Sequence, residues 1–328
     1  MNHKIWIAWE RQRRSIELAK ATDSELIVIE YCGFFRYIKC LIKTFLIVKR
    51  KKPEILFIQN PSIILAFFST CFLRLIFSIP VVVDRHSNFL LTPKKRFLLV
   101  EYLFNFLSYL TIRHADLTIV TNENLAHVIR VLGGKPFVLP DKIPLLVKGS
   151  KDYLKGGKKL LAISSFAEDE PIQELISAFS KEEMGSFSLY ISGNSKKCKI
   201  HHKIPKNVFL TGFLSEDNFV ELLFEVDAVI VLTKMEYTLL CGCYEAISAE
   251  KPLITSKTAV LEALFTGALF VKNDPDSISD GVQKLFLKFL EYKLNSLNMK
   301  KELNQKWNEK FETLSNILHT IIFERNNI

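Results

Sequence analysis

Three side chains that could bind a ligand or move a proton follow one apolar run in the first half of the chain. Asp84, His86 and Asn88 come after Val81–Val83, a β-branched run that predicts a strand buried on both faces. We expect them to project from the carboxyl end of this strand into a cleft between two domains. A histidine there can hydrogen bond a ligand or shuttle a proton, and an aspartate can orient it. The alternative is that His86 caps the following loop.

A second polar segment lies in the other half of the chain. Thr233–Thr238 separates a predicted strand at Val229–Leu232 from a predicted helix at Leu239–Ala249. Ligands of open α/β sheets bind at such positions, beside the start of the helix. Backbone N–H groups at a helix start suit a phosphate, and Glu245 can accept hydrogen bonds from sugar or ribose hydroxyls. The segment therefore predicts a cradle for a phosphorylated ligand.

This order of strand, polar loop, acidic residue, helix with Glu245-Ala246 and then Lys251-Pro252 resembles the donor site of GT-B glycosyltransferases, particularly glycosyltransferase family 4. That family usually places seven residues between two glutamates. Here eight residues separate Glu236 from Glu245, and Tyr237 stands at the expected place. Either the loop has one extra residue or Glu236 is not the equivalent glutamate.

The resemblance implies a role for individual residues. His86 would contact the transferred sugar, with Asp84 orienting it, and Glu236 or Tyr237 would bind sugar hydroxyls. Glu245 would bind the ribose. The other residues expected to bind the donor are Ser165, Gly193, Asn194, Gly212, Phe213, Lys234, Thr238 and Leu239. The resemblance implies retention of anomeric configuration, no metal, and no cofactor apart from a UDP- or GDP-linked sugar as co-substrate.

The loop at Ser164–Pro171 departs from the family. Family members usually place an arginine and a lysine here to neutralise the donor diphosphate, whereas this chain has Glu168, Asp169 and Glu170. Acids at a helix start also fit the helix dipole. The diphosphate would then need Lys234, backbone amides of the loop or arginines of the first domain, and the departure is also compatible with an inactive relative.

Three arginines stand near the start of the first predicted helix, where family members often have glycines. Arg11, Arg13 and Arg14 oppose the helix dipole, an arrangement that is better tolerated if they bind an anion. We predict that they bind a phosphate of the donor or of a lipid-linked acceptor. The alternative is an exposed basic turn.

Length and the order of predicted elements indicate two domains. The chain has 328 residues, more than one core usually holds. Strand-like and helix-like segments alternate on both sides of a Pro- and Gly-rich connection at Pro136–Gly157, which predicts parallel sheets. We expect an α/β protein of GT-B fold with two Rossmann-like domains and a ligand cleft between them. The predicted bounds are 1–148 for an acceptor domain, 149–300 for a nucleotide-sugar domain and 301–328 for a helix that packs back on the first.

Other features of the sequence narrow the partners. The net charge of +9 favours an anionic partner, but no nucleic-acid-binding module is recognisable. Ile63–Ile79 approaches the length of a membrane span, yet predicted strands flank it, and we expect a buried helix. Tyr37–Lys52 and Lys94–Tyr109 mix bases with apolar residues. They fit either an anionic membrane surface or core helices with solvated lysines.

Several motifs are expected to be structural. Cys241 and Cys243 flank a glycine on the helix of the cradle, which favours close packing over a redox pair. Asp274-Pro275-Asp276 has the form of a metal-binding DxD motif but precedes a predicted helix, and a capping turn is expected. Cys198, His201 and His202 lack a matched second ligand pair, so no zinc site is expected.

The sequence as a whole predicts a hexosyltransferase that moves a sugar from a nucleotide-diphosphate sugar to a glycan or lipid-linked acceptor, in cell-surface polysaccharide or glycolipid synthesis. We expect the protein in the cytoplasm or peripheral on the inner face of the cell membrane. Two alternatives are a nucleotide-sugar epimerase and a catalytically silent partner subunit of another glycosyltransferase.

Overall fold

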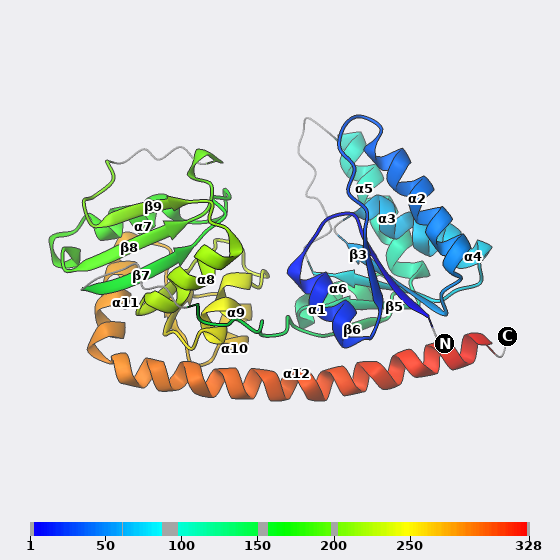
Figure 1. Cartoon of the computed structure of the whole chain (residues 1–328). Coiled ribbons are helices and arrows are strands. Elements are labelled where there is room, and N and C mark those ends of the chain that lie inside the picture. Colours follow the sequence, from blue (N-terminus) through cyan, green and yellow to red (C-terminus); the bar gives the residue numbers. More distant parts are fainter. Residues whose placement is uncertain (1–2, 61, 87–97, 150–156, 198–202, 327–328) are drawn as a thin grey trace. The chain divides into compact units, whose positions relative to one another are not determined.

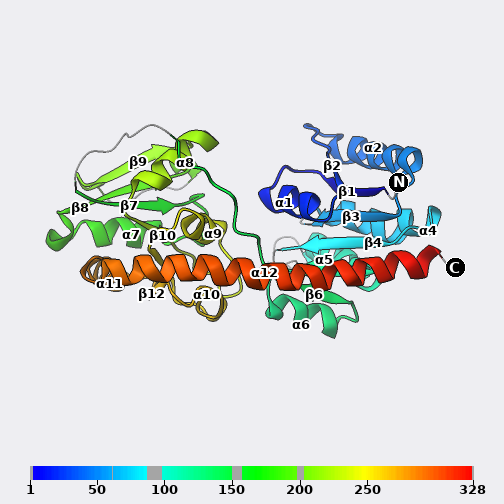
Figure 2. The same cartoon turned by 60° about the horizontal axis from the view of Figure 1, so that its bottom comes forward.

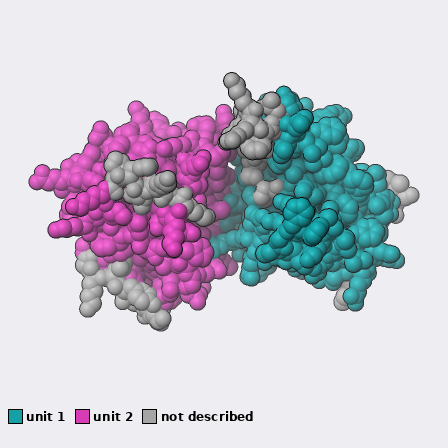
Figure 3. All heavy atoms as spheres, turned by 90° about the horizontal axis from the view of Figure 1, so that it is seen from above, with its two compact units in different colours: residues 1–142, 306–328 teal, residues 143–305 magenta. Residues whose placement is uncertain are grey.

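The computed structural model of the chain describes residues 3–60, 62–86, 98–149, 157–197 and 203–326. The chain forms two compact units, one of residues 1–142 with 306–328 and the other of residues 143–305 (Figure 3). They are called unit 1 and unit 2 below. Asn88, Cys198, His201 and His202 lie outside the described residues.

Unit 1 is built around a six-stranded parallel sheet with the order β2-β1-β3-β4-β5-β6 (Figure 1). Its strands are β1 (Lys4–Ala8), β2 (Glu25–Val28), β3 (Ile55–Asn60), β4 (Val81–Arg85), β5 (Leu117–Val120) and β6 (Pro136–Val138). Its helices are α1 (Arg13–Ala21), α2 (Arg36–Lys51), α3 (Ile63–Phe68), the π-helical η1 (Ser69–Leu73), α4 (Arg74–Ile76), α5 (Leu98–His114), α6 (Glu123–Val131) and the last part of α12 (Phe289–Asn326).

Helices cover both faces of the unit 1 sheet. Successive side chains of each strand point to opposite faces, so both sets are buried. Ile5, Ile7 and Ile58 pack with residues of α2 and α3 on one face. Trp6 and Phe57 stack on the other face, with ring centroids 5.1 Å apart, and pack with α1 and α12. This double burial explains why the strands read as continuous apolar runs.

Unit 2 repeats this architecture with a second six-stranded parallel sheet, of order β12-β11-β10-β7-β8-β9. Its strands are β7 (Lys158–Ile163), β8 (Phe187–Ser192), β9 (Val208–Gly212), β10 (Ala228–Val231), β11 (Leu253–Ser256) and β12 (Leu269–Val271). Its helices are α7 (Ile172–Phe179), η2 (Glu182–Met184), η3 (Ser195–Lys197), α8 (Glu216–Glu225), α9 (Cys241–Ser248), α10 (Ala259–Leu264), α11 (Pro275–Leu287) and the first part of α12. Two parallel sheets flanked by helices confirm the predicted pair of Rossmann-like domains.

Close packing accounts for two of the motifs. A Cβ on Gly242 would lie 3.0 Å from Val231 Cγ1 and 3.1 Å from Ile163 Cγ2, so the helix can approach the sheet only without a side chain there. Burial raises the pKa of the neighbouring Cys243 thiol to about 12, which keeps it protonated. Asp274 caps α11, where its carboxylate accepts a hydrogen bond of 2.8 Å from Ser277 N.

Two predicted segments differ from the structure. Pro136–Gly157 was expected to be connection throughout, but Pro136–Val138 forms β6 and pairs with β5. Proline is tolerated there because β6 is an edge strand and Pro136 is its first residue. The predicted helix at Ile63–Ile79 is α3, η1 and α4 in succession. No helix in the described part of the chain is both long and apolar enough to cross a bilayer.

The last helix, α12, contributes to the core of each unit separately. Its residues Met299 and Leu303 pack in a core cluster of unit 2. Further along, Trp307 is 5% exposed in unit 1, stacks on Phe311 with centroids 4.9 Å apart, and donates a hydrogen bond of 3.2 Å to Pro140 O. Figure 2 shows this part of α12 running along the unit 1 sheet.

Replacement of Trp307 is therefore predicted to destabilise unit 1. Trp307→Ala removes a buried indole and should lower the free energy of unfolding by about 3–5 kcal/mol. Phe323→Ala is the matched control, because Phe323 is 69% exposed on the same helix. Differential scanning calorimetry of both variants measures the effect. An unchanged transition in Trp307→Ala would contradict the assigned packing.

Candidate active site

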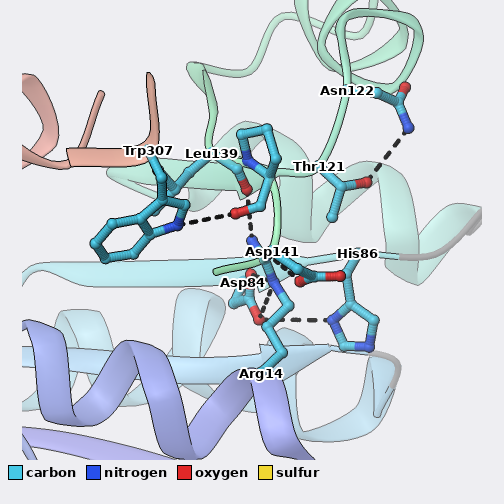
Figure 4. Close-up of polar contacts among 9 residues, drawn as sticks. Arg14, Asp84, His86, Thr121, Asn122, Leu139, Asp141 and Trp307 are labelled. Atoms are coloured by element: carbon cyan, nitrogen blue, oxygen red, sulfur yellow. Dashed lines mark hydrogen bonds and ion pairs between the residues drawn. The ribbon is translucent and has the colours of Figure 1, made fainter. Parts of the chain in front are cut away.

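The strands of the unit 1 sheet are parallel, so their carboxyl ends meet along one edge. Polar side chains follow several of these ends (Figure 4). His86 comes after β4, Thr121 and Asn122 come after β5, and Arg14 lies in the first turn of α1. This edge brings together Arg14, Asp84 and His86, three of the residues that the sequence singled out in the first half of the chain.

Arg14 is the centre of this cluster. Its side chain is 6% exposed, and its Nε donates to both Asp84 oxygens at 2.9 and 3.2 Å. Nη1 donates to Asp141 Oδ1 at 2.6 Å, and Nη2 donates to Leu139 O at 3.0 Å. One guanidinium thus joins α1, β4 and the segment after β6, and all of its nitrogens have acceptors.

The charges in this cluster stabilise one another. Burial alone would raise the pKa of Asp84, but the positive charge of Arg14 and the contact with His86 hold it below its ordinary value. Burial alone would lower the pKa of Arg14, and the charges of Asp84 and Asp141 raise it instead. Asp84 is therefore a carboxylate at neutral pH although it is fully buried.

His86 lies next to this ion pair. Asp84 and His86 are two residues apart at the end of β4, so their side chains fall on the same side of the sheet. His86 Nδ1 is 3.5 Å from Asp84 Oδ2, and the side chain is 20% exposed. Figure 4 shows the other ring nitrogen pointing away from Asp84. Asp84 thus biases the proton toward Nδ1 and leaves Nε2 as the acceptor in the neutral ring.

Arg85, between these two residues, points to the opposite face of the sheet. It is 1% exposed and its Nη1 donates to Ser108 Oγ of α5 at 2.8 Å. Burial lowers its pKa to about 9. Arg85 therefore belongs to the packed core beneath α5 and not to the polar cluster around Arg14.

The three predicted phosphate-binding arginines occupy different environments. Arg11 is exposed, and its backbone N–H donates to Glu30 Oε1 at 3.1 Å. Arg13 is half-buried. Arg14 departs from the prediction, because its guanidinium is committed to Asp84, Asp141 and Leu139. Phosphate binding stays a prediction for Arg11 and Arg13 only.

In unit 2 the order of the strands reverses between β7 and β10, which are neighbours in the sheet. Such a switch point opens a crevice at the carboxyl edge where ligands of α/β proteins bind. The loops after these two strands carry most of the predicted donor-binding residues. They are joined by two hydrogen bonds, from Lys234 N to Asp169 O at 2.7 Å and from Thr233 Oγ1 to Asp169 Oδ2 at 2.8 Å.

Glu170 folds back on the loop that precedes it. Its carboxylate accepts hydrogen bonds from Ser165 N at 3.0 Å, Phe166 N at 2.9 Å and Ser165 Oγ at 2.8 Å, and from Ser164 Oγ. Phe166 has a positive φ of 57°, which turns these amides toward one carboxylate. The amides that could neutralise a donor phosphate therefore hold an internal anion.

Lys234, the cation on which the predicted donor site depends, also has an internal partner. Its Nζ lies 2.8 Å from Glu174 Oε1, with side-chain exposures of 46% and 28%. An exposed pair of this kind contributes little to stability and exchanges readily. Lys234 can therefore turn to a ligand phosphate at small cost.

The glycines predicted to line the donor site allow close backbone approach. Gly193 follows β8 with φ of 114°, and a Cβ there would lie 2.1 Å from Ser164 O, so only glycine fits. Its N–H donates to Gly212 O at 3.0 Å, and Gly212 has φ of 73°. Asn194 Oδ1 accepts from Lys196 N at 3.2 Å, and Phe213 is 87% exposed. The structure thus brings Ser164, Gly193 and Gly212 together and leaves Phe213 in solvent.

The loop after β10 differs in detail from the prediction. Helix α9 begins at Cys241, so Thr238 and Leu239 precede the helix and do not form its first turn. Glu236 Oε1 accepts a hydrogen bond of 2.9 Å from Ala259 N, the first residue of α10, which gives it a capping contact. Tyr237 is 55% exposed. Glu245 lies within α9 and is half-buried.

Some residues of these clusters carried no recognisable signal in the sequence. Asp141 and Glu174 bind Arg14 and Lys234 from distant segments, which no local pattern reveals. In the sequence, Glu170 is distinguished only as one of three consecutive acidic residues. Among the described residues, no group of three or more His, Cys, Asp or Glu side chains is placed to hold a metal ion.

Comparison with known proteins identifies the second unit. Residues 148–302 match the family described as glycosyl transferases group 1. Unit 2 is therefore a group 1 glycosyl transferase domain, and the chain has the GT-B fold. No curated protein matches it.

Solved structures with the GT-B fold resemble nearly the whole chain. HepE from Anabaena, solved with UDP and glucose, has a TM-score of 0.74 at 12% identity and covers 97% of this chain and 100% of its own. Sucrose-phosphate synthase from Thermosynechococcus elongatus has a TM-score of 0.71 at 13% identity, covering 92% and 84%. Trehalose 6-phosphate synthase from Burkholderia multivorans has a TM-score of 0.66 at 12% identity, covering 91% and 78%.

The predicted GT-B fold and the predicted enzyme class, a glycosyltransferase, are thereby confirmed, and transfer of a hexose stays a prediction. The narrower resemblance to family 4 stays a prediction. The site residues likewise remain predictions, now with known surroundings.

Removal of the Arg14 side chain is predicted to have a pH-dependent effect on the free energy of unfolding. Arg14→Met leaves Asp84 buried without its main partner, which should lower the free energy of unfolding at pH 7 by about 3–5 kcal/mol. The folded-state pKa of Asp84 is depressed in the natural protein, so its stabilising effect is present at neutral pH and is lost as pH falls below about 4. The difference between the two proteins should therefore shrink on acidification.

Urea denaturation of both proteins between neutral and acidic pH measures this difference. Arg13→Met, on the same turn, is the comparison variant and should cost much less. A difference between natural protein and Arg14→Met that does not change with pH would contradict the assigned ion pair.

Glu170 is predicted to hold its loop together. Glu170→Ala removes the acceptor of Ser165 N and leaves Phe166 N with Ser164 Oγ as its acceptor, and the free energy of unfolding should fall by about 1–3 kcal/mol. Glu168→Ala removes the same charge from an exposed neighbour and should change it by less than about 0.5 kcal/mol. Chemical denaturation that finds equal effects in both variants would refute the role of the Glu170 carboxylate.

Proposed function

We propose that the enzyme transfers a hexose from a nucleotide-diphosphate sugar, UDP- or GDP-linked, to a glycan or lipid-linked acceptor. The bond between the anomeric carbon and the diphosphate oxygen breaks, a bond to the acceptor oxygen forms, and the acceptor hydroxyl loses its proton. The observation that carries this proposal is the match of residues 148–302 to group 1 glycosyl transferases, with polar loops at the β7/β10 switch point of the same unit. HepE, with UDP and glucose bound, supports UDP-glucose as the first donor to test.

The proposed roles come from the family resemblance and are compatible with the surroundings of each residue. Glu245 binds the ribose hydroxyls from within α9. The diphosphate binds Lys234, which is released from Glu174, and backbone N–H groups at the start of α9. Its negative charge is then stabilised mainly by these backbone dipoles. His86, held by Asp84 in one tautomer, hydrogen bonds the sugar through Nε2.

The finer parts of the proposal come from the family resemblance. We propose retention of anomeric configuration, independence of metal ions, and a role in cell-surface polysaccharide or glycolipid synthesis. We also propose peripheral association with the inner face of the cell membrane. Transfer that persists in EDTA and gives the anomer of the donor would support the first two points.

A second candidate is a catalytically silent partner subunit of another glycosyltransferase. The observation in its favour is that groups expected to bind the diphosphate already have internal partners. Loop amides donate to the Glu170 carboxylate, and Lys234 forms an ion pair with Glu174. A thermal-shift screen against UDP, GDP and their sugars separates the candidates, because a bound ligand raises the apparent stability. No shift with any nucleotide would favour the silent subunit.

Substitution of two residues tests the proposed roles. Glu245→Ala removes a charged acceptor from the ribose and should raise the KM for the donor about 10- to 100-fold. His86→Ala should lower kcat by about 10²- to 10⁴-fold, because a positioned general acid or base typically accelerates a reaction by this factor. Steady-state assays with UDP-glucose measure both effects.

Two variants serve as controls. Glu312→Ala and His127→Ala remove the same side chains from exposed positions on α12 and α6 and should change neither KM nor kcat. Natural rates in Glu245→Ala and His86→Ala would refute the proposed site.

A further inference from the structure

One surface of unit 1 is unusually apolar. Phe34, Ile38, Ile42 and Leu46 are 94, 54, 57 and 55% exposed. Their spacing of four residues makes them one continuous row along α2 and the turn before it. The opposite side of the same helix, with Val48 among its residues, is buried. The row therefore faces outward while α2 is packed by its other side.

A basic row runs beside the apolar one. Lys39, Lys43 and Arg50 are exposed, and no carboxylate among the described residues pairs with them. Lys39 and Lys43 lie over the ring of Tyr31, with Nζ 6.0 and 5.7 Å from its centroid. The stretch 36–52 carries seven basic residues and no acidic one. This surface, called the α2 face below, thus combines unpaired positive charge with exposed apolar side chains.

The two rows meet in an open groove of about 760 Å³. Its apolar wall includes Ile42 and Leu46, and its basic wall includes Lys39, Lys43 and Arg50. Such a groove offers cations for an anionic group and an adjoining apolar surface for a hydrocarbon chain. These are the two parts of a phospholipid.

Neighbouring helices extend the apolar area of unit 1. Leu75 and Ile76 of α4 are 66 and 60% exposed, and Leu99, Leu103 and Phe106 of α5 are 86, 58 and 56% exposed. Helices α2, α3, α4 and α5 lie on the same side of the unit 1 sheet in Figure 1. Exposed apolar residues concentrated in this way mark an interaction surface.

We propose that the α2 face binds an anionic phospholipid headgroup at a membrane surface. In this arrangement Lys39, Lys43 and Arg50 contact lipid phosphates while the apolar row enters the boundary of the acyl chains. A second copy of the chain is a poor occupant, because a symmetric contact would bring two like-charged basic rows together. Nucleic acid would pair with the positive charge, but it would leave the apolar row from Phe34 to Leu46 without an apolar partner.

The inference deepens the membrane association proposed above by naming its surface and lipid class. It does not depend on glycosyl transfer, because lipid binding and nucleotide binding are measured separately. A protein that binds lipid without nucleotide would leave this inference intact and count against the proposed enzyme activity.

Co-sedimentation of the full chain with vesicles tests the inference. Vesicles of phosphatidylglycerol with phosphatidylcholine should bind the natural protein, and vesicles of phosphatidylcholine alone should bind it far more weakly. Each Lys or Arg near an anionic surface is worth roughly a fivefold change in binding. The variant K39E/K43E/R50E should therefore lose about 100-fold or more in partitioning, and added salt should weaken the natural protein.

Two further variants complete the experiment. K206E/K284E/K301E makes the same charge change at exposed lysines elsewhere and should stay within about threefold of the natural protein. I42S/L46S keeps the charge and should weaken binding about tenfold or more, since each buried apolar side chain contributes. Circular dichroism checks the fold of every variant. Equal loss in the control, or no loss in folded K39E/K43E/R50E, would overturn the proposal.

Discussion

The buried guanidinium of Arg14 is the constraint on which the candidate site of unit 1 depends. It binds Asp84, Asp141 and Leu139 O together. Because these acceptors lie at the end of β4 and in the segment after β6, this one side chain joins both to α1 at the carboxyl edge of the sheet. The orientation of His86 follows, since its Nδ1 faces the carboxylate that Arg14 holds in its charged form.

In unit 2 the central charged group is a carboxylate, whereas in unit 1 it is the guanidinium of Arg14. Where related enzymes are expected to present cations to a diphosphate, this chain presents Glu170 bound to its own loop and Lys234 bound to Glu174. The exposed Lys234–Glu174 pair is weak, whereas the Glu170 carboxylate has four donors. We therefore expect donor binding at this edge to depend on Lys234 and on helix N–H groups, because the cations usual in the loop after β7 are replaced by acids.

Much of the fold was readable from the sequence because each strand is buried on both faces and so forms a continuous apolar run. Individual placements near strand ends were also predictable, since Asp84 and His86 must share a side of the sheet. The partners of the charged residues were not predictable. Arg14 meets Asp141 across 127 residues of chain, and Glu236 caps a helix that begins 23 residues later. Such contacts depend on tertiary packing, which no local pattern records.

The proposed function requires that a nucleotide sugar binds at the β7/β10 switch point of unit 2. Hydrogen-exchange mass spectrometry of the full chain with and without UDP-glucose tests it directly, because it reports where amides become protected. We expect slower exchange in residues 164–170 and 233–245 when the donor is present. Protection confined to other segments, at donor concentrations that raise the melting temperature, would contradict it.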